Sequence, residues 1–333
     1  MTEHLFPFLS YWWFYAAFTA LVVACLSLDL GLFHRKAHTI GFREASAWTA
    51  IWALLALLFC FGLYKYTTSL FGAAVGKQIG LEFLTGYVVE WSLSLDNMFV
   101  FVLVFRYFGI PQILHHRVLF FGILGALIFR GVFIALGTTL LQHGWVVIVF
   151  GAFLILTGVR MLFSTERPLR PEQSWIVRLL RRFLPVAQDY DGSQFLVRRR
   201  GKLHATPLLL TLAFIEATDI LFAIDSVPAI FAITSEPLVV YTSNVFAILG
   251  LRAMYFLLAG ALNKFHLLRY GLALILIFVG LKMAFLNAAW GGHFPTLISL
   301  GVILGILAVA IAASLMFPPP PPPNDLAAAK PDL

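Results

Sequence analysis

The sequence predicts an all-α, polytopic transmembrane helical bundle of about nine spans. Of the 333 residues, 61% are hydrophobic and only 12% are charged, whereas soluble proteins carry about 25% charged residues. The mean hydropathy is +0.91. Apolar stretches of about 20 residues, the length a helix needs to cross a bilayer, recur along the chain. These observations exclude a soluble enzyme, a disordered chain and a fibrous protein.

Nine apolar stretches mark the expected spans, and we expect helices because a bilayer demands internally satisfied backbones. The stretches cover about 11–33, 45–64, 83–105, 118–140, 145–163, 206–233, 241–262, 268–288 and 295–317. Both cysteines, Cys25 and Cys60, fall inside the first two stretches. The sequence therefore gives no support to a disulfide framework.

The distribution of Lys and Arg predicts an N-terminus outside and a C-terminus in the cytoplasm. With this orientation, 17 of the 23 basic residues lie on the inner side and only Lys65 and Lys77 lie on the outer side, as the positive-inside rule requires. The basic residues flank apolar stretches, so the net charge of +7 does not indicate a nucleic-acid partner. Within the basic loop, residues 175–184 read as a short amphipathic helix on the inner membrane surface.

An internal repeat relates two parts of the chain. Glu90 and Asp96 match Asp219 and Asp225 at an offset of 129, and Arg130 matches Arg252 at an offset of 122. Each unit contains three spans, so the two units must be inverted relative to each other, as in many secondary transporters. The predicted organisation is a two-span extension (1–82), a first three-helix repeat (83–163), a basic cytoplasmic loop (164–204), a second inverted repeat (205–288), a final span (289–317) and a proline-rich disordered tail (318–333).

Six of the 16 acidic residues lie in the apolar stretches: Asp29, Glu90, Asp96, Glu216, Asp219 and Asp225. Each costs about 2.5–3.5 kcal/mol at the bilayer centre on insertion scales. Pairing with Arg130 and Arg252 is the structural alternative, but two deep arginines cannot neutralise six carboxylates. We therefore expect a bound cation or protons to supply the remaining positive charge.

The donor atoms limit the choice of cation. All nine histidines fall in loops, tails or span ends, so zinc and copper lack their preferred ligands. Oxygen donors suit Mn²⁺, Mg²⁺ or Ca²⁺. The predicted metal ligands are Glu90, Asp96, Glu216, Asp219 and Asp225, and the predicted supporting residues are Ser94, Asn97, Ser226, Asp29, Arg130 and Arg252.

The spacing of the carboxylates restricts their geometry. Positions six apart on a regular helix differ by about 120° around its axis, so Glu90 and Asp96 cannot both point at one place unless the helix is interrupted or the site lies between several helices. Pro228 cannot donate to the carbonyl of Ile224, so an interrupted helix beside Asp225 is one solution.

These acidic segments resemble the TerC family, the membrane proteins named for tellurium resistance, and in particular its long, Alx-like members. The matching stretches are Glu82–Phe101, Val118–Ala126, Thr206–Leu210 and Glu216–Thr234. The resemblance implies a bacterial inner-membrane transporter from a superfamily that includes lysine exporters, with members acting in Mn²⁺ efflux. It also implies that the family's acidic motif falls on the five predicted ligands, although Trp91 stands where a more polar residue is expected.

The sequence and the resemblance together predict export of a divalent cation, with Mn²⁺ favoured, by alternating access and proton exchange. The expected partners are the lipid bilayer, the metal ion and protons, without a prosthetic group or enzymatic activity. Two alternatives remain: a cationic amino-acid exporter, and a non-transporting membrane factor for metal loading or tellurium resistance. An intramembrane aspartyl protease is disfavoured because neither Asp96 nor Asp225 lies in a Gly-x-Gly-Asp element.

Overall fold

Long apolar helices make up nearly all of the protein. The computed structural model describes residues 4–31, 41–140, 143–163, 177–179, 182, 185–187, 192, 194–199, 202–259, 267–291 and 294–317, with every side chain in them except those of residues 27–31, 96, 99, 199, 202 and 259. Within these residues, nine helices are long and apolar enough to cross a membrane. This finding confirms the predicted polytopic helical fold.

The helices follow the predicted apolar stretches, and several extend beyond them. They are α1 Phe8–Gly31, α2 Phe42–Phe71, α3 Ala73–Tyr107, α4 Gln112–Leu140, α5 Gly144–Phe163, α7 Pro207–Phe231, α8 Pro237–Ala259, α9 Leu268–Leu281 and α11 Thr296–Met316. A π-helical turn, η3 (Lys282–Leu286), and the short α10 (Asn287–Ala289) continue α9. With 35 residues, α3 is about 52 Å long, more than the hydrocarbon core requires.

The predicted interruption beside Asp225 is wrong, because α7 is continuous from Pro207 to Phe231. Pro207 opens this helix, where its missing N–H costs no hydrogen bond. Pro228 lies only three residues before the end of the helix. The carbonyl of Ile224 loses its usual donor there, but the helix ends before a second half could form.

The basic loop contributes a small hairpin that the sequence did not predict. Strand β1 (Leu196–Arg199) pairs antiparallel with β2 (Lys202–Ala205), and Leu196 lies opposite Ala205. Of the predicted amphipathic helix, 177–179 form a helical turn, but most of it lies outside the described residues. The proline-rich tail, 318–333, lies outside them altogether.

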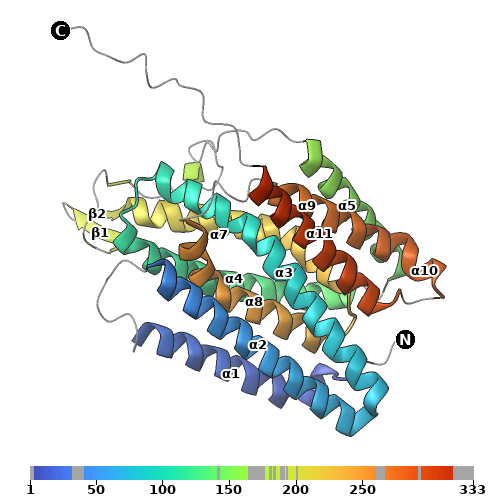
Figure 1. Cartoon of the computed structure of the whole chain (residues 1–333). Helices are drawn as coiled ribbons and strands as arrows, with labels where there is room; N and C mark the ends of the chain where they lie inside the picture. Colours follow the sequence, from blue (N-terminus) through green and yellow to red (C-terminus); the bar gives the residue numbers. More distant parts are fainter. Residues whose placement is uncertain are drawn as a thin grey trace.

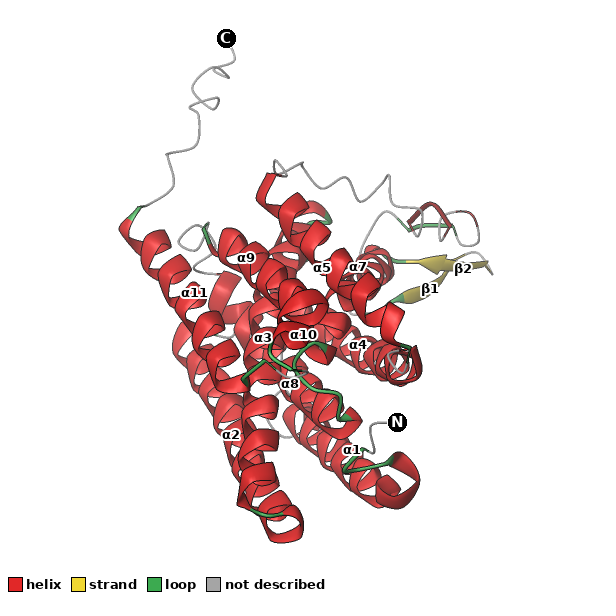
Figure 2. Cartoon of the chain, turned by 90° about the vertical axis from the view of Figure 1, so that its right-hand side faces the viewer, coloured by secondary structure: helices red, strands yellow, loops and turns green. Residues whose placement is uncertain are grey.

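The bundle is centred on α3 and α8, whose membrane-spanning parts are the most buried. Helix α3 packs on α2, α7, α8 and α11, α4 packs on α7 and α8, and α5 packs on α9. Helix α1 lies at the edge of the bundle (Figures 1 and 2). The N-terminus and α10 lie at one end, called the N-terminal face below, and the β1–β2 hairpin lies at the opposite end, called the hairpin face (Figure 1).

Candidate functional site

Among the described basic residues, Arg130 of α4 is the most buried, at 1% exposed. Its Nη1 atom forms an ion pair with Oε1 of Glu90 on α3 and donates a hydrogen bond of 2.8 Å to Oδ1 of Asn244 on α8. Its Nη2 atom lies 3.6 Å from Oδ1 of Asp219 on α7. One guanidinium group therefore joins four helices.

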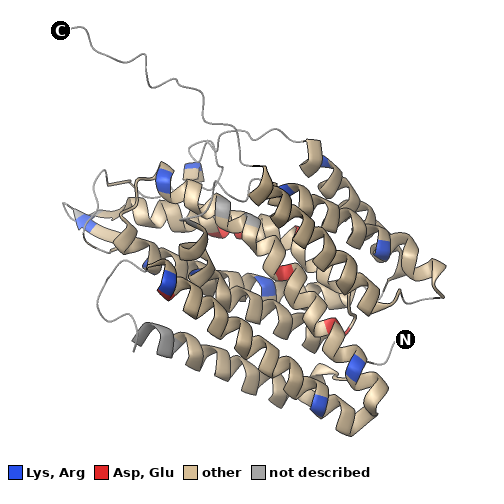
Figure 3. Cartoon of the chain, in the orientation of Figure 1, with Lys and Arg blue, Asp and Glu red and all other residues tan. Residues whose placement is uncertain are grey.

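Glu90 is fully buried on α3. Ser94, one helical turn further along, donates a hydrogen bond of 3.4 Å to Oε1 of Glu90, and Asn97 is also buried on this helix. Glu90, Ser94 and Asn97, spaced four and three residues apart, therefore share one buried face of α3. Figure 3 shows that the acidic positions lie along the interior of the bundle, whereas the basic positions gather mostly toward its ends.

Several polar atoms around Arg130 are buried without a hydrogen-bond partner in the described part of the chain. They are Oε2 of Glu90, Oδ2 of Asp219 and Nδ2 of Asn244. A buried acceptor left without a donor costs about 1–3 kcal/mol, and more if it is charged. Two carboxylates share one guanidinium here, so the cluster of Glu90, Asp219 and Arg130 carries one excess negative charge when all three are ionised.

Glu216 lies one turn before Asp219 on α7, and its carboxylate packs directly against Gly125 of α4. A Cβ atom at Gly125 would overlap the carboxylate of Glu216 in its present position, so the glycine lets this carboxylate lie against α4. The Oε2 atom of Glu216 is buried and finds no hydrogen-bond partner among the described residues. The two helices are thus shaped to hold this carboxylate inside their interface.

Asp225 points in a different direction from Asp219, as the six-residue spacing predicts. It is half-buried, and Oγ1 of Thr157 on α5 donates a hydrogen bond of 3.4 Å to its Oδ1 atom. The neighbouring Ser226 is buried, and its hydroxyl has no hydrogen-bond partner within the described chain. Residues Asp219 and Asp225 therefore face α4 and α5 respectively.

The four predicted ligands whose side chains are described, Glu90, Glu216, Asp219 and Asp225, do not form a single cage. Among the residues that the structure describes, no three His, Cys, Asp or Glu side chains are arranged to hold a metal ion. The side chains of Asp29 and Asp96 lie outside the described residues. The structure brings Glu90 and Asp219 together at Arg130 and sets Glu216 one turn away, while Arg252 is buried on α8.

Sequence reasoning missed Asn244, which binds Arg130 directly. The segment 242–244, Thr-Ser-Asn, is polar within an apolar stretch, and the insertion cost that singled out the carboxylates applies to amides as well. Sequence reasoning also missed a second buried group of charges formed by Glu82, Glu236 and Lys282. Glu82 lies just before the expected span 83–105, so it was not counted among the membrane carboxylates.

Comparison with known proteins identifies the family. The chain is 46% identical over 318 residues to an uncharacterized membrane protein of Myxococcus xanthus, covering 95% of this chain and 96% of that protein. It is 45% identical over 299 residues to a Salmonella typhi protein and 44% identical over 297 residues to an Escherichia coli K12 protein, each covering 89% of this chain and 92% of the relative.

Both of the latter are named "Putative membrane-bound redox modulator Alx". No solved structure matches the chain. The model of the integral membrane protein TerC family matches residues 75–319, which cover all but the first two residues of α3 and every described helix from α4 to α11. Because the family model matches most of the chain and the relatives cover nearly all of it, this multi-pass membrane protein belongs to the TerC family.

Proposed function

We propose that this TerC-family protein exports a divalent metal cation, with Mn²⁺ as the favoured substrate, by alternating access coupled to proton exchange. Glu90, Asp96, Asp219 and Asp225 are the proposed principal ligands. Glu216 and Asp29 are proposed to support them or to carry protons. The proposed location is a bacterial inner membrane, with the N-terminal face outside.

One observation carries this proposal: Arg130 is shared by two buried carboxylates, and each of them keeps an oxygen without a hydrogen-bond partner in the described chain. In a low-dielectric interior, an excess negative charge is stable only when a proton or a cation compensates it. The available donors are carboxylate and amide oxygens, which suit hard cations such as Mn²⁺.

Arg130 stands where a cation shared by Glu90 and Asp219 would have to bind. The proposal therefore requires the guanidinium to move when the metal enters. Asn244 can hold Arg130 in the meantime, because its amide oxygen accepts from Nη1 without adding charge. If Arg130 and the metal ion bind these carboxylates in turn, a positive charge stays next to Glu90 and Asp219 throughout the transport cycle.

Helix packing supports alternating access between two inverted units. If α3, α4 and α5 correspond to α7, α8 and α9, the α3–α8 contact corresponds to the α7–α4 contact, and both pairs are in contact. The helices α5 and α9 meet at glycines. A Cβ at Gly158 would lie 2.7 Å from the carbonyl oxygen of Ala273, and a Cβ at Gly280 would lie 2.7 Å from that of Gly151. The predicted offset of 122 residues relates Gly158 to Gly280 and Gly151 to Ala273. The proposed repeat therefore maps one of these contacts onto the other.

A flux assay in proteoliposomes tests the proposal. We expect Glu90→Gln, Asp96→Asn, Asp219→Asn and Asp225→Asn each to lower Mn²⁺ flux at least about tenfold, because each removes a charged ligand. Glu44→Gln, in the first turn of α2, is the matched control and should keep the parental rate. Parental rates in Asp96→Asn and Asp225→Asn would show that the ligand assignment is wrong.

The relatives' name favours a second candidate, a membrane factor that acts on redox balance or metal loading without transport. Cys25 and Cys60 are both free, so they do not form a disulfide in this structure. Metal binding without net flux would support this candidate, and inhibition of flux by lysine would instead support a cationic amino-acid exporter.

A further inference from the structure

A second set of buried charges lies between Arg130 and the N-terminal face. Glu82 of α3 is 7% exposed, Lys282 of η3 is 3% exposed, and Glu236, just before α8, is 8% exposed. Removing ionised groups from water is costly unless the surrounding protein compensates them. None of the three belongs to the proposed metal site, so their burial needs another explanation.

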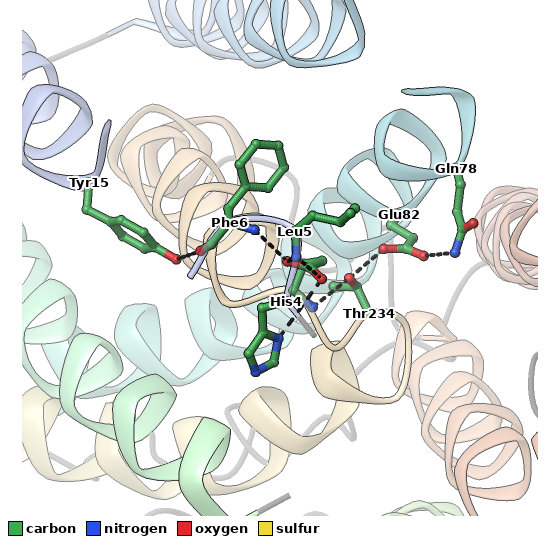
Figure 4. Close-up of polar contacts among 8 residues, drawn as sticks. His4, Leu5, Phe6, Tyr15, Gln78, Glu82 and Thr234 are labelled. Atoms are coloured by element: carbon green, nitrogen blue, oxygen red, sulfur yellow. Dashed lines mark hydrogen bonds and ion pairs between the residues drawn. The ribbon is translucent and has the colours of Figure 1, made fainter. Parts of the chain in front are cut away.

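Glu82 lies at the centre of this set. Oγ1 of Thr234 donates a hydrogen bond of 2.5 Å to one carboxylate oxygen, and Nε2 of Gln78 donates one of 2.8 Å to the other (Figure 4). Two charged groups on neighbouring elements act on it electrostatically: Lys282 attracts its negative charge, and Glu236 repels it. When all three are ionised, the set carries one net negative charge, which one proton would neutralise.

Polar contacts lead from Glu82 to the N-terminal face. The backbone N–H of Glu236 donates a hydrogen bond of 3.1 Å to Oγ1 of Thr234. The carboxylate of Glu236 accepts hydrogen bonds of 3.0 Å from the backbone N–H of Leu5 and 3.4 Å from that of Phe6. His4, whose side chain is 27% exposed, lies 4.0 Å from the same carboxylate. These contacts, drawn in Figure 4, therefore run from Glu82 to His4, which is partly exposed.

Polar residues also lead from Glu82 toward Arg130. Glu82 and Glu90 are eight residues apart on α3, or about 12 Å along its axis and about 80° around it. Gly86 lies midway between them, and a Cβ there would lie 3.0 Å from Oγ of Ser243 on α8. Ser243 precedes Asn244, which binds Arg130. The α3–α8 interface thus carries polar groups from one carboxylate to the other.

The position of Lys282 is unusual because it opens a π-helical turn in an otherwise regular span. Such turns insert an extra residue into a helix and occur frequently at functional sites. An ammonium group is a compact charge on a flexible stem, and it can follow a carboxylate whose charge changes. From this turn, the buried Lys282 acts electrostatically on Glu82 of α3.

We propose that Glu82 takes up the exchanged proton from the N-terminal face and passes it toward Glu90, with Lys282 as its counter-charge. This inference rests on the proposed function and separates the proton-carrying carboxylate from the metal ligands. A proton from water converts the Glu82 carboxylate to the acid and neutralises the set. Its release toward Glu90 regenerates the carboxylate and the attraction of Lys282.

Two modes of transport in proteoliposomes test the inference. We expect Glu82→Gln to lower net Mn²⁺ flux driven by a pH gradient at least about tenfold, while Mn²⁺–Mn²⁺ exchange at equal pH stays within about twofold of the parental rate. Glu82→Asp should restore part of the driven flux because it restores a titrating group. Glu44→Gln should keep both modes. A purely structural role would lower both modes together, and that result would overturn the inference, as would parental driven flux in Glu82→Gln.

Infrared difference spectra detect protonation of Glu82 without any measurement of Mn²⁺ flux. They can therefore test this inference even if the proposed function is wrong. Between about pH 8 and about pH 5, we expect the purified parental protein to gain a protonated-carboxyl band component that Glu82→Gln lacks. If the parental protein moves no Mn²⁺ in either mode, the proposed function fails, and the spectra still report on Glu82. Identical spectra for the two proteins would show that Glu82 does not bind the proton.

Discussion

At the scale of single residues, Arg130 matters because its planar guanidinium reaches three acceptors on three other helices at once. Its Nη1 atom serves Glu90 and Asn244, and its Nη2 atom lies nearest Asp219. A lysine ammonium would offer one point of charge and could not span the same three groups. The geometry of this side chain, and not its charge alone, brings α3, α7 and α8 together around α4.

Gly125 offers a residue-scale test of how Glu216 is positioned. In an open helical position, Gly→Ala adds about 1 kcal/mol of stability because glycine is a poor helix former. At Gly125 the added methyl group would overlap the Glu216 carboxylate, which must then leave the α4–α7 interface. Because this carboxylate is the end of a flexible side chain that can turn away, we expect Gly125→Ala to reduce Mn²⁺ flux with little change in the thermal unfolding midpoint in detergent.

Gly131 is the matched control, because it lies on the same helix and a Cβ there would meet nothing within 4 Å. We expect Gly131→Ala to keep the parental Mn²⁺ flux and to leave the unfolding midpoint unchanged or slightly raised. Equal behaviour of the two variants would contradict the placement of Glu216 against α4.

The sequence predicted some of the site at this scale. Glu90 and Asp219 stood out because charge in an apolar span is costly, and the divergence of Asp219 from Asp225 followed from helical periodicity. The contact of Thr157 with Asp225 could not be predicted, because it depends on how α5 packs against α7. Asn97 was predicted because it follows Asp96 directly, whereas Asn244 has no carboxylate beside it in the sequence and was missed.

At the scale of elements, the helices were predicted well and their ends less well. Helix α3 begins at Ala73, ten residues before the expected span 83–105. Lys77, Gln78 and Glu82 lower the hydropathy of its first turns, yet these residues form helices readily. The β1–β2 hairpin was missed because each strand has only four residues, which is too short for a clear alternating pattern.

The close packing of α5 on α9 can be tested by enlarging the glycines at their interface. Close helix packing in membranes depends on small residues that let backbones approach. A Cβ at Gly158 would lie 2.7 Å from a side-chain carbon of Ile277, and one at Gly280 would lie 2.8 Å from a side-chain carbon of Ile155. We expect Gly158→Ala and Gly280→Ala each to destabilise the protein by about 1–3 kcal/mol, measured by unfolding in detergent.

If the two units are related by the proposed symmetry, Gly158→Ala and Gly280→Ala should lower the free energy of unfolding by similar amounts. Gly301→Ala on α11 is the control, because a Cβ there would meet nothing within 4 Å. A large cost at one glycine and none at the other would count against equivalent roles for α5 and α9.

At the scale of the whole molecule, the nine helices run alternately between the N-terminal face and the hairpin face. The hairpin and the C-terminal end of α11 lie on the same side, where Arg43, Arg106 and Arg269 stand at the ends of α2, α3 and α9. In the sequence, the segments that connect the helices at these ends carry most of the Lys and Arg. Since positively charged loops are retained in the cytoplasm, this side should face inward. The export direction in the proposed function depends on that orientation.

Cysteine labelling tests the orientation. After both native cysteines are replaced by serine, Trp290→Cys places a thiol beside α10, and Leu203→Cys places one on β2; the native side chains are 56% and 46% exposed. We expect a membrane-impermeant maleimide to label Trp290→Cys in intact cells and Leu203→Cys in inverted vesicles. The reverse pattern would put the N-terminal face inside, so that the Glu82 set would open to the cytoplasm and the proposed proton step would have the wrong direction for antiport.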